Sequence, residues 1–271
     1  MGHLLSVLMP VFNAEKYLAQ SIESILSQSF KEYELIIVDD CSYDESLEII
    51  KKYAKFDSRI SFYQNHKNLG IAGNRNMCFN YSVGEYIAWQ DADDISLENR
   101  LQLQFDFLNA NSNVGIIGGA MELFERNQII GYRHYPLEDA SIRRNIYKYS
   151  TIAQPTMMIR RSALLEAGPY NLTYPPAEDL DMTFRIGRTW RLANTKETLI
   201  KYRVNEGSAT FKAMKVMEIN SAVIRQNNMN SLAFRATLGD RLFCLLHRIS
   251  IYIIPSRFKY ILFSAWRNRD K

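Results

Sequence analysis

The stretch 84–94 constrains the fold of this chain most strongly, because an apolar run ends there in three carboxylates within four positions. The run 86–89 is short and lies between a Gly-Glu turn and a polar cluster, which favours a buried strand over a helix. Asp91, Asp93 and Asp94 then follow the carboxyl end of that strand. In an open α/β sheet, ligands bind at this edge.

The three clustered carboxylates have two interpretations. They repel one another and are costly to desolvate, unless a divalent cation that prefers oxygen ligands compensates their charge. An Asp-x-Asp (DXD) motif at a strand end therefore suggests a metal that in turn holds phosphate. The alternative is an acidic turn that caps the next helix, with Asp94 or Ser96 near the helix N-terminus. The tripeptide alone does not separate these interpretations.

Strand and helix patterns alternate through residues 4–110 with short connections. Continuous apolar runs at 4–9 and 34–38 are typical of parallel strands. The alternation predicts an α/β fold with a Rossmann-like, mainly parallel sheet flanked by helices. The second strand also ends in acids, Asp39 and Asp40, so two strands would place charge at the same sheet edge. A nucleotide with a metal is the simplest ligand for such an edge.

Three helix starts carry specific signals. Asn13 is expected to cap the first helix, and Ser42 with Glu45 forms a capping-box pattern before the second. Further along, 180–187 is expected to be a short helix with Asp179 at its start. The helix dipole there would favour the ionised carboxylate that a general base requires. The alternative is that Asp179 only caps this helix.

Charge and cysteine content limit the partners and the compartment. The chain has 33 basic and 29 acidic residues, and the basic surplus gathers in 241–271. A nucleic-acid-binding domain would carry a basic face on its folded body, so we expect no nucleic acid. Three separated cysteines without paired metal spacing argue against disulfides and zinc, and no signal peptide or membrane span is expected. These features predict a cytoplasmic protein.

The motifs, taken in order, resemble those of the inverting family-2 glycosyltransferases with the GT-A fold. The matching segments are Ser6–Asn13, Ile37–Ser42, Asn68–Gly70, Arg75-Asn76, Gly84–Ile87, Asp91–Asp94, Met158–Ser162, Glu178-Asp179 and Tyr202-Arg203. This resemblance implies a GT-A catalytic domain at 1–211, with a nucleotide-binding half at 1–110 and an acceptor half at 111–211. A helical, basic and amphipathic C-terminal extension would follow at 212–271.

The resemblance also implies roles for residues that bind the nucleotide sugar. Pro10 and Phe12 would line the base and ribose pocket, and Asp40 would accept a hydrogen bond from the base, typically uracil. Arg75 would approach the base or the diphosphate. Asp91 would contact the ribose or the water shell of the metal.

The remaining roles concern the metal and the chemistry. Asp93, together with Asp91, would bind the Mg²⁺ or Mn²⁺ that bridges the diphosphate, and Glu178 belongs to the same donor-binding set. Asp179 would be the catalytic base that deprotonates an acceptor hydroxyl. Two departures matter: Val204-Asn205 stands where many relatives have a His ligand, and the Gln-x-x-Arg-Trp signature of processive synthases is missing.

The implied activity is metal-dependent, inverting and non-processive transfer of a hexose or N-acetylhexosamine. The donor would be a nucleotide sugar, in the first place a UDP-sugar. The acceptor would be a glycan or a lipid-linked glycan in the synthesis of surface polysaccharide or lipopolysaccharide. The alternative from another class is a non-catalytic scaffold protein that binds nucleotide sugars, and the retention of Asp179 argues against it.

The C-terminal extension has two interpretations. Helices are expected at 214–226 and 231–250, and Phe258, Ile261 and Leu262 then recur beside basic residues. A basic amphipathic helix with aromatic residues is typical of a peripheral membrane segment, which would place the protein at the inner face of the cytoplasmic membrane. The alternative is that these helices pack on the catalytic domain or on a second subunit, as in a homodimer.

Overall fold

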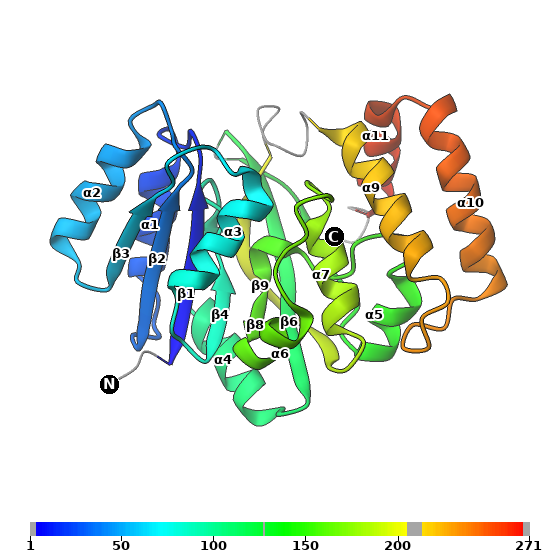
Figure 1. Ribbon diagram of the computed structural model, residues 1–271, viewed down its shortest axis with the longest axis horizontal. Coiled ribbons are helices and arrows are strands. Elements are labelled where there is room, and N and C mark those ends of the chain that lie inside the picture. Colours follow the sequence, from blue (N-terminus) through cyan, green and yellow to red (C-terminus); the bar gives the residue numbers. More distant parts are fainter. Residues whose placement is uncertain (1–3, 127, 205–212, 268–271) are drawn as a thin grey trace.

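The computed structural model describes residues 4–126, 128–204 and 213–267, and within them the strands form one mixed sheet (Figure 1). Within these residues the strands are β1 (Leu5–Val11), β2 (Tyr33–Asp39), β3 (Ile60–Gln64), β4 (Tyr86–Trp89), β5 (Ile95–Ser96), β6 (Val114–Glu125), β7 (Gln128–Arg133), β8 (Met158–Arg160) and β9 (Arg191–Arg203). Their order is β3-β2-β1-β4-β8-β6-β9-β5, with β7 paired to β6.

Helices cover both faces of this sheet and continue beyond it. They are α1 (Leu18–Leu26), α2 (Ser46–Phe56), α3 (Gly70–Tyr81), α4 (Arg100–Ala110), α5 (Asp139–Asn145), α6 (Arg161–Ala167), α7 (Glu178–Ile186), α9 (Met214–Asn227), α10 (Leu238–Ile253) and α11 (Ser256–Arg267), with a 3₁₀ turn η1 at Gln154–Thr156. One core layer joins α1, α2 and α4 to the sheet, and a second layer joins α3, α6 and α7 to the opposite face.

The first half of the sheet confirms the predicted Rossmann-like arrangement. β1 pairs in parallel with β2 on one side and with β4 on the other, and β2 pairs in parallel with β3. Every residue of β1 and β2 is buried, because helices cover both faces. Asp39 ends β2, and Asp91 follows β4 after Gln90, so the predicted acids do meet at one edge.

The second half is mixed, and it contains β7 and β9, which the sequence analysis missed. β8 runs antiparallel between β4 and β6, and β9 runs parallel to β6 along most of its length. The sheet is therefore continuous across residue 110. The division into two halves at that point stays a prediction.

Two predicted helix caps are wrong. α1 begins after Tyr17 and α2 after Glu45, and neither start has a side-chain cap. Asn13 instead has a left-handed φ of 49°, and its side-chain oxygen accepts a hydrogen bond from Tyr43 N. Ser42 Oγ accepts from Asn13 N. These polar side chains tie the loop after β1 to the loop after β2, which shapes the sheet edge where the acids lie.

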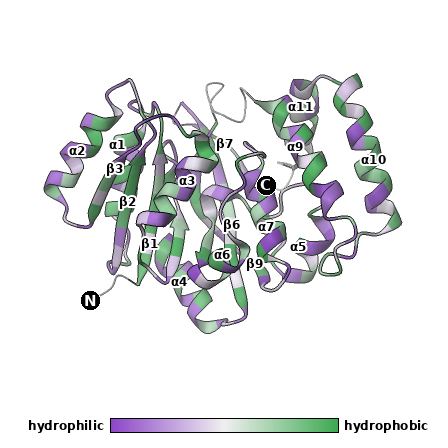
Figure 2. Cartoon of the chain, in the orientation of Figure 1, coloured by the Kyte–Doolittle hydropathy of each residue, from purple (hydrophilic) through white to green (hydrophobic). Residues whose placement is uncertain are grey.

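The C-terminal extension is helical, as predicted, and stands at one end of the molecule (Figure 1). α9 packs against α7, α10 and α11. α10 begins at Leu238, later than expected, because Thr237 and Asp240 form a capping box. Cys244 and Ile251 of α10 are buried, whereas many apolar side chains of α10 and α11 are exposed. Figure 2 shows how many residues of α10 are hydrophobic. No helix in the described part of the chain is long and apolar enough to cross a membrane.

Candidate active site

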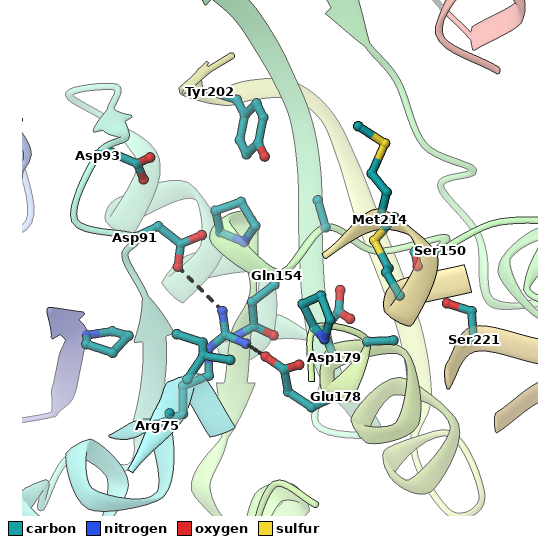
Figure 3. Close-up of a pocket in the computed structure, with 18 of the residues that line it drawn as sticks. Arg75, Asp91, Asp93, Ser150, Gln154, Glu178, Asp179, Tyr202, Met214 and Ser221 are labelled. Atoms are coloured by element: carbon teal, nitrogen blue, oxygen red, sulfur yellow. Dashed lines mark hydrogen bonds and ion pairs between the residues drawn. The ribbon is translucent and has the colours of Figure 1, made fainter. Parts of the chain in front are cut away.

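A pocket of about 1030 Å³ opens at the edge of the sheet where the acidic strand ends meet. It extends from the end of β1, past the turn after β4 and the start of α7, to the C-terminal helices (Figure 3). The residues that the sequence singled out for donor, metal and catalysis all line it: Pro10, Phe12, Asp40, Arg75, Asp91, Asp93, Glu178 and Asp179. The structure therefore brings the whole predicted set together.

Hydrogen bonds from Gln90 and Arg203 hold the acidic turn after β4 in place. Gln90 Nε2 donates to Asp91 O at 3.1 Å and to Asp94 O at 2.9 Å. Arg203 N donates to Asp94 Oδ1 at 2.8 Å, and Arg203 Nε donates to Asp93 O at 2.9 Å. Asp94 is thus a structural member of the turn, and Asp91 and Asp93 are the carboxylates left for the pocket.

Crowding of these carboxylates changes their acidity. Burial raises the pKa of Asp93 to about 6, and the negative charge of Asp91 adds to the rise. The pKa of Asp94 lies well above its usual range for the same reasons, since burial, Asp93 and Asp91 all oppose its ionisation. A cation placed between Asp91 and Asp93 would relieve this repulsion.

The carboxylate oxygens of Asp91 and Asp93 are ligands that fit a hard divalent cation. Mg²⁺ is commonly bound through one or two carboxylates plus substrate phosphates, with no complete cage of protein ligands. Asp91 and Asp93 would supply such a pair. Among the described residues there is no group of three His, Cys, Asp or Glu side chains that could hold a metal. Asn205, at the place where many relatives have a His ligand, lies outside the described residues.

Arg75 connects the acidic turn to the start of α7. Its guanidinium forms an ion pair with Glu178 and lies 3.6 Å from Asp91 Oδ1 (Figure 3). Its guanidinium carbon also lies over the rings of Trp89 and Tyr170, at 5.9 and 5.8 Å from their centroids. Arg75 is therefore a fixed positive charge at the centre of the pocket.

Asp179 lies in the first turn of α7, as predicted, but its protonation differs from the prediction. Its Oδ1 accepts a hydrogen bond from Leu180 N at 2.8 Å. Burial and then the charge of Glu178 nevertheless raise the pKa of Asp179 to about 7, and Arg75 offsets only part of the rise. The helix N-terminus therefore does not keep this carboxylate fully ionised at neutral pH, because desolvation opposes ionisation.

The carboxylate of Asp40 already accepts three hydrogen bonds from the protein itself. Its carboxylate accepts hydrogen bonds from Asn65 Nδ2 at 2.7 Å, Leu69 N at 2.9 Å and Gly70 N at 2.9 Å. A carboxylate has about four acceptor sites, so one remains for a nucleobase. Asp40 thus fixes the start of α3, and its contact with a base stays a prediction.

Phe12 and Pro10 form the far end of the pocket. The ring of Phe12 is 47% exposed and meets Tyr43 edge-on at 6.0 Å between centroids. Pro10 is buried in β1 and presents one side to the pocket. An exposed aromatic face at this place is suited to stacking on a base.

The sequence analysis missed the other end of the pocket. Its lining there comes from the C-terminal helices: Met214, Met217, Glu218, Ser221, Arg225, Phe243, His247, Ser256 and Lys259. Part of this wall could have been found from the sequence: the lining positions in 214–225 recur every three or four residues, so they share one face of a helix. A pattern of polar residues on a helix face does not by itself distinguish a pocket wall from a solvated surface.

Comparison with known proteins identifies the class. The model of the family described as "Glycosyl transferase family 2" matches residues 6–168, more than half of the chain. The chain belongs to glycosyltransferase family 2, and its sheet and flanking helices form the GT-A fold of that family.

Individual relatives and solved structures agree with this assignment. The chain is 37% identical over 216 residues to a Bacillus subtilis (strain 168) protein named as the glycosyltransferase EpsE, covering 78% of this chain and 76% of that protein. It is 28% identical over 260 residues to the Escherichia coli UDP-Glc:alpha-D-GlcNAc-diphosphoundecaprenol beta-1,3-glucosyltransferase WfgD, covering 95% and 97%.

Two solved structures are similar in fold. S. aureus TarS 1–349 in complex with UDP-GlcNAc has a TM-score of 0.62 at 20% identity, covering 91% of this chain and 79% of that one. The mannosyltransferase PcManGT from Pyrobaculum calidifontis, solved with GDP-Man and Mn2+, has a TM-score of 0.62 at 15% identity, covering 99% and 87%.

Proposed function

We propose that this glycosyltransferase transfers one sugar per encounter, with inversion, from a nucleotide sugar to a lipid-linked glycan in surface polysaccharide synthesis. The observation that carries the proposal is the shared pocket: the carboxylate of Asp179 and the charged groups of Arg75, Asp91 and Asp93 line one cavity. A base and a diphosphate site in one cavity are what sugar transfer from a nucleotide requires. WfgD, named for a UDP-Glc donor and a diphosphoundecaprenol-linked acceptor, matches nearly the whole chain.

The donor half of the pocket would bind the nucleotide sugar. Phe12 and Pro10 would contact the base and ribose, with a UDP-sugar as the first candidate. Asp91 and Asp93 would hold Mg²⁺ or Mn²⁺, which when bound supplies positive charge to the diphosphate leaving group. Arg75 contributes a second, permanent positive charge beside Asp91.

Asp179 would take the proton from the acceptor hydroxyl. With a pKa of about 7, it is divided between its two protonation states at neutral pH, which suits a general base. The deprotonated oxygen then attacks the anomeric carbon on the face opposite the leaving diphosphate. An α-linked donor gives a β-linked product.

The exposed apolar side chains of the C-terminal helices would contact the membrane that holds a lipid-linked acceptor. They include Leu242, Leu245, Leu246, Ile249, Tyr252 and Ile253 of α10 and Phe258, Ile261 and Leu262 of α11. Amphipathic helices of this kind lie in the membrane interface without spanning it. The reaction would then take place at the cytoplasmic face. Burial of the same surface in a homodimer is the alternative.

Nucleotide binding tests the donor class. UDP, GDP, CMP and dTDP are each added with and without Mn²⁺, and thermal unfolding is followed. A nucleotide that binds only the folded state raises stability by roughly 2.7 kcal/mol at a hundredfold excess over its Kd. We expect a Mn²⁺-dependent shift with UDP. A nucleotide shift without donor hydrolysis or transfer would support the scaffold alternative, and no shift with any nucleotide would contradict the proposal.

A further inference from the structure

The pocket continues past Asp179, away from the donor residues. In Figure 3, Met214 and Ser221 lie on one side of Asp179, and Asp91 and Asp93 lie on the other. This second half is walled by α9, α10 and α11, and the same helices carry the exposed apolar side chains of the C-terminal extension. An acceptor that reaches Asp179 from the membrane side would pass through it.

Arg225 is the unusual residue of this half. Its side chain is 6% exposed and lines the pocket. Nε donates to Ile146 O at 3.2 Å, and within residues 4–126, 128–204 and 213–267 the guanidinium has no ion pair and no further hydrogen bond. Burial lowers the pKa of Arg225 to about 10, which still leaves it protonated at neutral pH. The terminal nitrogens of a buried cation are thus available to the pocket.

Arg100, another buried arginine, has many more hydrogen-bond partners than Arg225. Arg100 donates to Gln104, Gln90, Ser96 and the Trp89 carbonyl. A buried guanidinium with few partners is costly, because the charge loses its hydration without compensation. Such a group persists where a ligand supplies the missing acceptors.

The charges near Arg225 do not neutralise it. Lys259 Nζ pairs with Glu218 Oε2 at 2.8 Å, so the Glu218 carboxylate is already balanced. His247 faces the same space, and burial, Arg225 and Lys259 lower its pKa to about 4, against the opposing effect of Glu218. His247 is therefore neutral at physiological pH. Asp179 acts on Arg225 electrostatically without forming an ion pair with it.

We propose that Arg225 binds a phosphate or diphosphate group of the acceptor. This inference rests on the proposed transfer to a lipid-linked glycan. The acceptor hydroxyl would lie at Asp179, its phosphate at Arg225, and its lipid chain along Phe243 toward the apolar surface of α10. A guanidinium offers paired donors that match phosphate oxygens, which lysine does not. The donor diphosphate is held separately, at Arg75, Asp91 and Asp93.

The test uses two probes that differ only in the anionic group, farnesyl diphosphate and farnesol. Each is titrated calorimetrically into the protein with UDP and Mn²⁺ at saturation, so that the donor site is filled. We expect the diphosphate to bind at least about tenfold more tightly than the alcohol, because a charged hydrogen bond is gained. Inorganic pyrophosphate, titrated in the same way, shows whether the anion alone suffices or the lipid chain is also required.

Variants then assign the effect to one side chain. Arg225→Gln should remove the preference for the diphosphate while binding of UDP with Mn²⁺ is unchanged, and Arg225→Lys should retain part of it. Arg191→Gln, an exposed arginine at the start of β9, is the matched control. Equal affinity for the two probes in the wild type, or an undiminished preference in Arg225→Gln, would overturn the proposal. If the wild type does not bind UDP with Mn²⁺ at all, that result would instead count against the proposed function.

Discussion

Arg75 donates to Glu178 in a buried ion pair that joins helix α3 to helix α7. The same guanidinium faces Asp91 at 3.6 Å, so one side chain links the acidic turn to the segment that carries Asp179. Glu178 is 2% exposed and Arg75 is 6% exposed. Because both charges are buried, each depends on the other for compensation, and the pair fixes the distance between the acidic turn and the start of α7.

Removing one partner of this pair should be more harmful than removing both. Arg75→Met leaves Glu178 buried and unpaired, and we expect a loss of about 3–5 kcal/mol in the free energy of unfolding. The double variant Arg75→Met/Glu178→Met should recover much of that loss, although it would not bind a nucleotide sugar. Urea unfolding of both single variants and the double variant gives the coupling energy. Additive single effects would show that the pair does not act as a unit.

The rate of sugar transfer should depend on the protonation of Asp179. Since its pKa is raised to about 7, kcat/KM should rise with pH between about 6 and 8 and level off above that range. A base with an ordinary carboxyl pKa would give a flat profile there. A pH profile that stays flat between 6 and 8, with nucleotide binding constant, would contradict this protonation state.

Asp179→Asn separates catalysis from stability. Transfer should fall by roughly 10²–10⁴-fold, while binding of UDP with Mn²⁺ is kept. The pKa of Asp179 is higher in the folded protein, at about 7, than in the unfolded chain. The wild type therefore loses stability as the pH rises from the unfolded-state pKa to about 7. The variant lacks this loss and should melt at a higher temperature than the wild type at pH 8, with little difference at pH 4. The same shift in melting temperature at both pH values would argue against the raised pKa.

Asp93 and Asp94 are adjacent and should behave differently. Asp93 faces the pocket, so Asp93→Asn should weaken Mn²⁺-dependent UDP binding at least about tenfold, because a charged ligand becomes neutral. Asp94 bonds Arg203 N and does not line the pocket, so Asp94→Asn should change nucleotide affinity little. Calorimetric titration of both variants with UDP and Mn²⁺ compares them. Equal losses would mean that the turn, and not a specific carboxylate, determines binding.

The sequence predicted that the acids after β2 and β4 meet at one edge of the sheet, because motif and strand end coincide there. The apolar runs of β1, β2 and β4 are continuous, and the acids that follow them can lie only at one edge. β9 was missed because Arg191–Arg203 mixes polar and apolar residues without strict alternation, and its pairing partner β6 lies far away in the chain. Long-range pairing of this kind leaves little local signal.

The protonation of Asp179 and the place of Arg225 in the pocket wall were not predictable from the sequence. Helix position suggested an ionised Asp179, but the pKa is set by burial among residues from α3, α7 and the loop before it. In the sequence, nothing distinguishes Arg225 from an ordinary polar residue of an amphipathic helix. Only the packing of α9 against α7 and α10 shows that it is buried and lines the pocket.

The exposed apolar surface of α10 gives the last prediction. Leu242 and Leu246 are 57% and 56% exposed and lie one turn apart. Leu242→Glu/Leu246→Glu should reduce partitioning onto vesicles of phosphatidylglycerol and phosphatidylethanolamine at least about tenfold, because burying each leucine is worth roughly 1.5–3 kcal/mol. Phe56→Glu, at an apolar position on α2 that is 78% exposed, is the control for added charge. Sedimentation with vesicles measures the bound fraction. If the double variant partitions like the wild type and its sedimentation coefficient falls, the surface is a dimer interface and not a membrane contact.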